Sequence, residues 1–391
     1  MPQVDFSDTK IAFADRSDSE LRRSHLLFSL MNYPLLVKAG TRLATFALRL
    51  HLPVKGLVKA TIFKQFCGGE SIEEARKVIR KLGKSNIKTI LDYGVEGKET
   101  EADFDRTAAY LAKTLEYARE DEDIHIISTK LSGLFRFAIL EKVSNGEALA
   151  EKEQEEYERG KGRVDKICKA AFESGIGVHI DAEESWIQGA VDEIAWEMSR
   201  RYNKKAPTVI NAVQLYRKGR LQFIKDSLQH ARENGYLCAV KLVRGAYMEK
   251  ERQRAREMGY PSPIQESLED THRAYNEGLK FCIDNIGELY VCNATHNEQS
   301  CRYQVELMEK KGLEPGHPLV ATAQLYGMSD NLSFNMADAG FNVEKYLPYG
   351  PVREVIPYLI RRTQENTSVG GQMSRELQLI RKELQRRSAE S

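Results

Sequence analysis

The spacing of apolar residues changes once along the chain, near residue 85. Before that point, apolar residues recur every three or four positions, which places them on one face of an α-helix. Ser71 followed by Glu74 is typical of a capping box at the start of the last such segment. The pattern predicts an N-terminal helical arm over residues 1–85. Its helices are expected in "SDSELRRSHLLFSLM", "LLVKAGTRLATFALRLHL" and "SIEEARKVIRKLGKSN".

Beyond residue 85, short apolar runs rich in β-branched residues alternate with long polar stretches of helical periodicity, such as "DRTAAYLAKTLEYARE" and "RLQFIKDSLQHAREN". This alternation is typical of repeated strand–helix units and a parallel sheet. The runs begin at Ile87, Ile124, Gly177, Thr208, Leu237, Leu289, Pro318 and Phe341.

Eight strand–helix units over residues 86–370 fit an α/β fold of the (β/α)8 TIM-barrel type. A doubly wound open sheet is the alternative, but no run is followed by G-x-G-x-x-G or G-x-x-x-x-G-K-[ST]. Residues 371–391 are expected to form a C-terminal helical tail. Its basic amphipathic segment "SRELQLIRKELQRR" could contact anionic lipid or pack on the barrel.

The working face of such a barrel lies at the carboxyl ends of its strands. Every predicted strand ends in a polar or ionisable residue, and eight such ends in succession indicate a functional site at this face. The residues are Asp92, Lys130, Asp181 with Glu183, Gln214, Lys241 with Arg244, Thr295-His296-Asn297, Gln324 and Tyr346.

Composition limits the classes of function. Charged residues make up 29% of the chain but nearly balance, at a net charge of +1, so nothing favours nucleic acid as a partner. The six cysteines form no C-x-x-C pair, which indicates a reducing compartment rather than a disulfide framework. The start of the chain resembles neither a secretory signal nor a transit peptide. We therefore expect a soluble cytoplasmic protein, and attachment to the inner face of a membrane stays open.

The candidate residues leave the chemistry open. No H-E-x-x-H or clustered Asp/His spacing accompanies His296, so no metal site is expected. Lys130 or Lys241 could act as a Schiff-base nucleophile, as in barrel aldolases, or as a fixed positive charge. In "KLVRGAYMEKERQRA", glycine after a predicted strand is a weak signal for phosphate binding.

Two adjacent arginines, Arg361 and Arg362, lie in the helical stretch "YLIRRTQEN". Successive helical residues point about 100° apart, so either one of the pair is solvated or both converge on a shared anion. Pro357 lacks an N–H and is predicted to be the first helical residue, which would place the arginines in the opening turns.

Several of these segments together resemble the proline dehydrogenase family, the FAD-dependent barrel enzymes that begin proline catabolism. They are "LDYGVEG", "STKLSGL", "IDAEE", "AVKLVRGAYMEKERQRA", "NATHN", "AQLYGMSD" and "KYLPYGPVREVIPYLIRRTQENTS". The resemblance runs in order from about residue 65 to residue 370. It implies an enzyme that oxidises L-proline to Δ1-pyrroline-5-carboxylate by hydride transfer to N5 of FAD and passes the electrons to a quinone.

The resemblance also implies roles for individual residues. Lys130, Arg361 and Arg362 would hold the substrate carboxylate. Leu325, Tyr346 and Tyr358 would enclose the pyrrolidine ring, and Asp181 and Glu365 would orient the cations. The FAD contacts would be Gln214, Lys241, Val243, Gly245, Thr295, His296 and Asn297.

The chain departs from the family in places. Many bacterial members have arginine at the position of Lys241, whereas mitochondrial-type members have lysine. The long insertion of animal members is absent between residues 131 and 165, and no fused aldehyde dehydrogenase is expected. Two rival functions remain: a Schiff-base aldolase on the same barrel, and a flavin-free barrel that binds amino acids and regulates.

Overall fold

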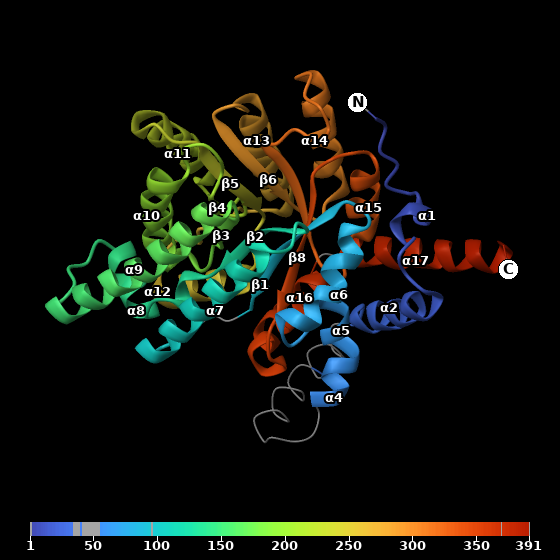
Figure 1. Cartoon of the computed structure of the whole chain (residues 1–391), viewed down its shortest axis with the longest axis horizontal. Helices are drawn as coiled ribbons and strands as arrows, with labels where there is room; N and C mark the ends of the chain where they lie inside the picture. The colour runs from blue at the N-terminus through green and yellow to red at the C-terminus, as the bar shows by residue number, and fades with distance from the viewer. Residues whose placement is uncertain (1, 34–39, 41–54, 95–96, 369, 391) are drawn as a thin grey trace.

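The computed structural model describes residues 2–33, 40, 55–94, 97–368 and 370–390 (Figure 1). Its eight strands are all parallel, and each is hydrogen-bonded to the next along the chain. The eighth strand pairs with the first, which closes the barrel. The predicted (β/α)8 barrel is therefore confirmed, and the open doubly wound sheet is excluded.

Each predicted apolar run contains one strand. The strands are β1 (Ile87–Tyr93), β2 (Ile124–Thr129), β3 (Gly177–Ile180), β4 (Val209–Gln214), β5 (Cys238–Val243), β6 (Leu289–Ala294), β7 (Val320–Leu325) and β8 (Val343–Tyr349).

Helices follow every strand and surround the barrel in Figure 1. In chain order they are α7 (Glu101–Arg119), the 3-10 turn η2 (Leu131–Gly133), α8 (Phe137–Ser144), α9 (Glu151–Ser174), α10 (Ser185–Tyr202), α11 (Arg220–Asn234), α12 (Met248–Met258), α13 (Leu268–Asp284), α14 (Glu298–Lys310), α15 (Asp330–Asp338), α16 (Val352–Ser368) and α17 (Gly370–Glu390).

The region before the barrel is helical where it is described. It contains α1 (Thr9–Ala12), α2 (Asp18–Met31), α4 (Lys55–Val58), the π-helix η1 (Lys59–Phe63), α5 (Lys64–Phe66) and α6 (Ile72–Gly83). The helix predicted over "LLVKAGTRLATFALRLHL" lies almost wholly outside the described residues.

Apolar packing divides into layers, as the barrel geometry requires. Two large clusters fill the space between the strands and the outer helices. A smaller cluster fills the barrel interior, because alternate residues of each strand point inward. Its buried members are Ile90, Ile126, Ile210, Ala239, Tyr290, Cys292, Ala321, Ala323 and Tyr346.

The C-terminal helix α17 packs against α2, α1 and α16, beside the barrel (Figure 1). Leu377 and Ile380 of α17 are buried in one cluster with Phe28 of α2. Buried ion pairs add to this junction: Asp330 at the start of α15 contacts Arg16 at 2.8 Å and Lys345 of β8 at 3.0 Å. Packing, one of the two roles left open for the tail, is therefore confirmed, and contact with lipid stays a prediction.

Two local predictions need correction. Pro357 is not the first helical residue, because α16 begins at Val352, where the carbonyl of Pro351 accepts from the amides of Glu354 and Val355. The two arginines therefore lie about three turns into the helix, where the helix dipole contributes little.

The capping box predicted at α6 is only half formed. The Ser71 hydroxyl accepts from the Glu74 amide at 3.3 Å, but the Glu74 carboxylate accepts from the amide of Glu70 instead.

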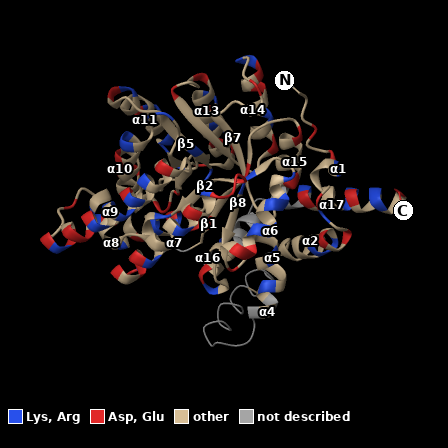
Figure 2. Ribbon diagram, viewed as in Figure 1, with Lys and Arg blue, Asp and Glu red and all other residues tan. Residues whose placement is uncertain are grey.

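Acidic and basic side chains are interspersed over the outer helices in Figure 2. This distribution agrees with the balanced net charge of the chain. Among the described helices, none combines the length and the apolar character that crossing a bilayer requires.

Candidate active site at the carboxyl end of the barrel

Four of the predicted site residues meet directly at the carboxyl ends of the strands. Asp181, just after β3, is the centre of this group. Its Oδ2 accepts from the hydroxyl of Tyr346 at 2.7 Å and lies 3.4 Å from Nζ of Lys130, and its Oδ1 contacts Nζ of Lys241. Lys241 also lies over the ring of Tyr346, 5.2 Å from its centroid. The strand ends therefore bring together residues that are far apart in the sequence.

Burial and charge fix the ionisation of this group. Burial by itself raises the pKa of Asp181, but Lys241 and Lys130 outweigh this effect and hold the pKa well below its usual range. Asp92 of β1 is buried with its Oδ1 3.7 Å from Nζ of Lys130, and burial raises its pKa despite that lysine. Asp181 is thus a fixed negative charge between two lysines.

Helix α16 lies over this end of the barrel, since Val355 packs close to Gly94 after β1 and to Gly350 after β8. Tyr358 is buried in the cluster beneath α16. Leu325, at the end of β7, packs against that cluster and also against the barrel interior. Leu325 is also the register partner of Tyr346, so these two residues are neighbours, whereas Tyr358 lies in the cluster beneath α16.

The predicted arginine pair lies on α16. The Arg361 guanidinium carbon is 5.6 Å from the ring centroid of Tyr247, a cation–π contact. The side chains of Arg362 and Glu365 are outside the described residues. Tyr247 was not among the predicted site residues, although it lies within the segment "KLVRGAYMEKERQRA". Its position in a βα loop was the signal that could have identified it.

The loops after β4 and β5 form a second part of the mouth. The side-chain amide of Gln214 donates to the carbonyl of Glu183 at 3.0 Å, while its buried Oε1 has no partner among the described residues. Nε and Nη1 of Arg217 are also buried without a hydrogen-bond partner in the described part of the chain. Gly245 has φ of 141°, and a Cβ there would overlap the ring of Tyr216. This position therefore requires glycine.

Arg244 connects the loops after β5 and β6. Its guanidinium donates to Oγ1 of Thr295 at 2.6 Å, to Oγ of Ser300 at 3.0 Å and to Nδ1 of His272 at 3.0 Å. Asn297 caps α14 by accepting from the amide of Ser300 at 2.9 Å. The loop that carries the predicted cofactor residues Thr295 and Asn297 is therefore held rigidly.

The third residue of that loop, His296, is tied to the C-terminal helix. Its Nδ1 lies 2.9 Å from the hydroxyl of Ser329, and the amide of Ser329 donates to Glu376 of α17 at 3.1 Å. Burial raises the pKa of Glu376 to about 7. Val243, the last residue of β5, is partly buried and lies beside these loops. The predicted cofactor residues thus share one rim with the four residues around Asp181.

Comparison with known proteins identifies the relatives of this chain. A family model described as "Proline dehydrogenase" matches residues 75–375. Proline dehydrogenase 1, mitochondrial, from Caenorhabditis elegans is 36% identical over 83% of this chain and 54% of that relative. Hydroxyproline dehydrogenase from Xenopus laevis is 31% identical over 98% of this chain and 90% of that relative.

Among solved structures, proline utilization A (PutA) from Bdellovibrio bacteriovorus has a TM-score of 0.73 at 19% sequence identity. The match covers 94% of this chain and 40% of that one. At this identity the likeness shows the fold alone. The chain spans about half the length of the nematode relative and two fifths of the bacterial one.

Proposed function

Since the chain belongs to the proline dehydrogenase family, we propose that it is a flavoenzyme that oxidises L-proline to Δ1-pyrroline-5-carboxylate. The observation that carries the proposal is the cluster of Lys130, Lys241 and Tyr346 around Asp181 at the barrel mouth. It provides fixed charges of both signs at a buried position, which suits the charged groups of a small amino acid.

The rim residues fit a flavin nucleotide. The side-chain oxygen of Gln214 and two nitrogens of the Arg217 guanidinium are buried. None of these atoms has a hydrogen-bond partner among the described residues. These groups match the donors and acceptors of a flavin ring and the negative charge of a pyrophosphate. Gly245 allows the backbone to approach such a ligand closely. The chemistry supplied by bound FAD is the acceptance of a hydride at its N5.

The cations near the mouth are proposed to bind the substrate carboxylate. Lys130 has its Nζ beside Asp181, and the Arg361 guanidinium of α16 lies over the ring of Tyr247 in the loop after β5. Arg362 and Glu365 follow on that helix and complete the proposed carboxylate site. In a water-poor pocket such charges orient the substrate strongly, because the effective dielectric is low.

Hydride loss from the carbon next to nitrogen requires a neutral amine, whose lone pair stabilises the developing iminium. Asp181 is a poor proton acceptor, because Lys241 and Lys130 hold its pKa well below the usual range. The substrate amine is therefore expected to lose its proton before the reaction or to solvent. Turnover should rise with pH toward the pKa of the bound amine.

The buried ring of Tyr346, with Leu325 and Tyr358, is proposed to enclose the pyrrolidine ring. Tyr346 is held in place by its hydrogen bond to Asp181. A rigid ring at this position favours proline over 4-hydroxyproline. The similarity to a hydroxyproline dehydrogenase makes this choice of substrate a point for direct measurement.

The electron acceptor is proposed to be a quinone, reached by peripheral contact with a membrane. A quinone is lipid-soluble, so the enzyme must meet it at a bilayer surface. The exposed apolar side chains of Leu26 and Leu30 on α2, with Tyr33 just beyond, are available for such contact.

Absorption spectroscopy of the purified protein, followed by a proline assay with a dye acceptor, tests the proposal. A flavin spectrum that is bleached by L-proline, with formation of Δ1-pyrroline-5-carboxylate, is expected. A substrate adduct trapped by borohydride on Lys130 or Lys241 would instead indicate the aldolase. Binding of proline without flavin or turnover would indicate a regulator.

A further inference from the structure

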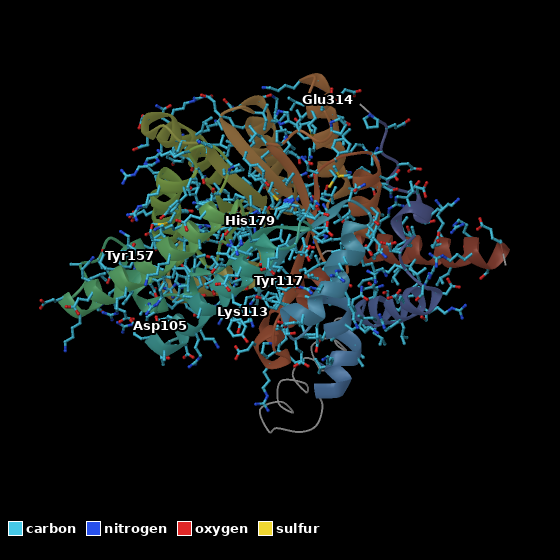
Figure 3. All side chains as sticks on the ribbon, viewed as in Figure 1. Asp105, Lys113, Tyr117, Tyr157, His179 and Glu314 are labelled. Carbon is cyan, nitrogen blue, oxygen red and sulfur yellow. The ribbon has the colours of Figure 1, made fainter. Side chains whose placement is uncertain are left out.

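Three side chains with metal-ligating atoms meet inside the barrel: His179 of β3, Cys292 of β6 and Glu344 of β8. Their ligand atoms all lie within 4.8 Å of one another, and Sγ of Cys292 is 3.8 Å from Oε2 of Glu344. Figure 3 places His179 at the centre of the barrel. The described residues contain no other group of three such side chains at this spacing.

Strand register shows that all three side chains face inward. Cys292 is the register partner of Ala321, and Glu344 is the partner of Ala323. His179 is the partner of Ile210. These three partners belong to the interior cluster, and residues paired across neighbouring strands point to the same side of the sheet.

The trio borders the proposed active site inside the barrel. His179 and Glu344 each precede a site residue, Asp181 and Tyr346, by two positions, which corresponds to about 6 to 7 Å along a strand. Cys292 is the register partner of Lys241. The trio therefore consists of other residues than those proposed to bind proline and FAD, but Lys241, one of the proposed FAD contacts, lies beside it.

His179 carries the strongest sign that a ligand belongs here. Its side chain is fully buried, and neither Nδ1 nor Nε2 has a hydrogen-bond partner among the described residues. Leaving a buried polar group unpaired costs about 1 to 3 kcal/mol, so such groups normally bind something. The neighbouring alanines at 321 and 323 are small for a barrel interior, where bulky branched residues dominate.

We propose that His179, Cys292 and Glu344 bind a single divalent transition-metal ion such as Zn²⁺. An imidazole nitrogen, a thiolate and a carboxylate form a mixed set that suits Zn²⁺ and its neighbours rather than Mg²⁺ or Ca²⁺. Ligand bonds of about 2.0 to 2.3 Å place tetrahedral ligand atoms about 3.5 Å apart, so the observed separations need only small side-chain adjustments.

Charge and proton balance are consistent with this site. Cys292 must lose its proton to bind, so metal binding releases that proton to solvent through the barrel mouth. The thiolate and the Glu344 carboxylate then neutralise the two positive charges of the ion. The Lys241 ammonium, whose charge also acts on all three side chains, is paired with Asp181. Three protein ligands leave the fourth tetrahedral position for water. The proposal does not depend on the proposed activity.

The test uses the full flavin-loaded chain, produced without a histidine tag in medium supplemented with Zn²⁺ or Co²⁺. After exhaustive dialysis, elemental analysis should find one metal ion per chain. The Co²⁺ form should show thiolate-to-metal charge transfer. In equilibrium dialysis against Zn²⁺, Cys292→Ala and His179→Gln should each bind more than about 100-fold more weakly, because loss even of a partner of a ligand costs 10- to 100-fold.

Cys168→Ala is the matched control, since Cys168 is equally buried but lies on α9 outside the barrel interior. It should retain full metal content. If Cys292→Ala fails to fold, as judged by flavin content and thermal unfolding, Glu344→Gln and His179→Gln decide the question. The proposal is overturned if the wild-type chain binds no stoichiometric metal, or if the folded trio variants bind it as the wild type does. Ordered water would then be the partner of His179.

Discussion

Asp181→Asn probes the charge balance at the centre of the proposed site. The substitution keeps the size of the side chain and an oxygen that can accept from the Tyr346 hydroxyl, so it removes mainly the negative charge. In this variant Lys130 retains its second carboxylate partner, because Oδ1 of Asp92 lies 3.7 Å from Nζ of Lys130. Lys241, however, loses the one carboxylate that it contacts among the described residues. The expected consequence is an uncompensated buried ammonium group.

The size of the effect follows from burial. Removing one partner of a buried ion pair costs about 3 to 5 kcal/mol. Because Lys130 stays paired, we expect the lower end, about 3 kcal/mol. An unfolding entropy of about 2 cal/mol/K per residue amounts to about 0.8 kcal/mol/K for a chain of 391 residues. The expected fall in Tm is therefore about 4 °C.

The assay is thermal unfolding by circular dichroism at saturating FAD, with a double-mutant cycle. Lys241→Met combined with Asp181→Asn removes both charges. The double variant should lose less stability than the sum of the two single variants, because it contains no unpaired buried charge at Lys241. Asp284→Asn, in the exposed pair with Lys280 on α13, is the control and should leave Tm unchanged.

The pH dependence gives a second check on the same pair. The folded-state pKa of Asp181 is depressed, so its contribution to stability is complete above the unfolded value of about 3.9 and is lost as pH falls below it. The difference in stability between wild type and Asp181→Asn should therefore narrow as the pH falls below about 4. Two results would refute the buried ion pair. One is a double variant whose loss of stability equals the sum of the two single losses, and the other is a stability difference between wild type and Asp181→Asn that grows as the pH falls.

Four further substitutions test the proposed roles. Lys241→Met should lower the flavin reduction potential more than it weakens proline binding, because a positive charge favours the anionic reduced flavin; an unchanged potential with lost proline binding would assign Lys241 to the substrate. Tyr346→Ser should lower kcat/KM for proline and shift the ratio toward 4-hydroxyproline by about 10-fold, from the 1 to 3 kcal/mol that pocket fit contributes; an unchanged ratio would place Tyr346 outside the pocket. Arg361→Met and Arg362→Met should each cost about 2 to 5 kcal/mol of transition-state stabilisation, roughly 30- to 5,000-fold in kcat/KM, with non-additive effects in the double variant and normal flavin content. Kinetics with a competitive carboxylate inhibitor measures this, and near-wild-type efficiency and inhibitor affinity in either single variant would remove that arginine from the site.

The barrel could be predicted from sequence because its signal is local and repeated. Each strand is a short β-branched run followed by a helical stretch, and a polar residue lies at or just after the end of each strand. In a parallel barrel all these ends meet at one face. Lys130, Asp181, Lys241 and Tyr346 could therefore be expected near one another before any coordinates, and the structure brings them into contact.

Local signals that compete with each other were less reliable. Pro357 has the properties of a first helical residue, but Pro351 starts α16 earlier, and the helix accommodates Pro357 in its interior. Tyr247 was overlooked because an aromatic residue in a loop carries no periodic signal. Its place in a βα loop was the one signal available in the sequence, and the structure adds its contact with Arg361.

The sequence by itself determined which residues form strands, which face of the barrel carries the site and which family the motifs resemble. Tertiary structure alone decided that Asp181 lies between two lysines, that Glu376 of the last helix supports the loop of His296 through Ser329, and that a histidine, a cysteine and a glutamate meet inside the barrel. The physical reason is that periodicity specifies which way a side chain points within its own element. Its neighbours from other elements depend on strand register and barrel closure, which join positions from 33 to 165 residues apart.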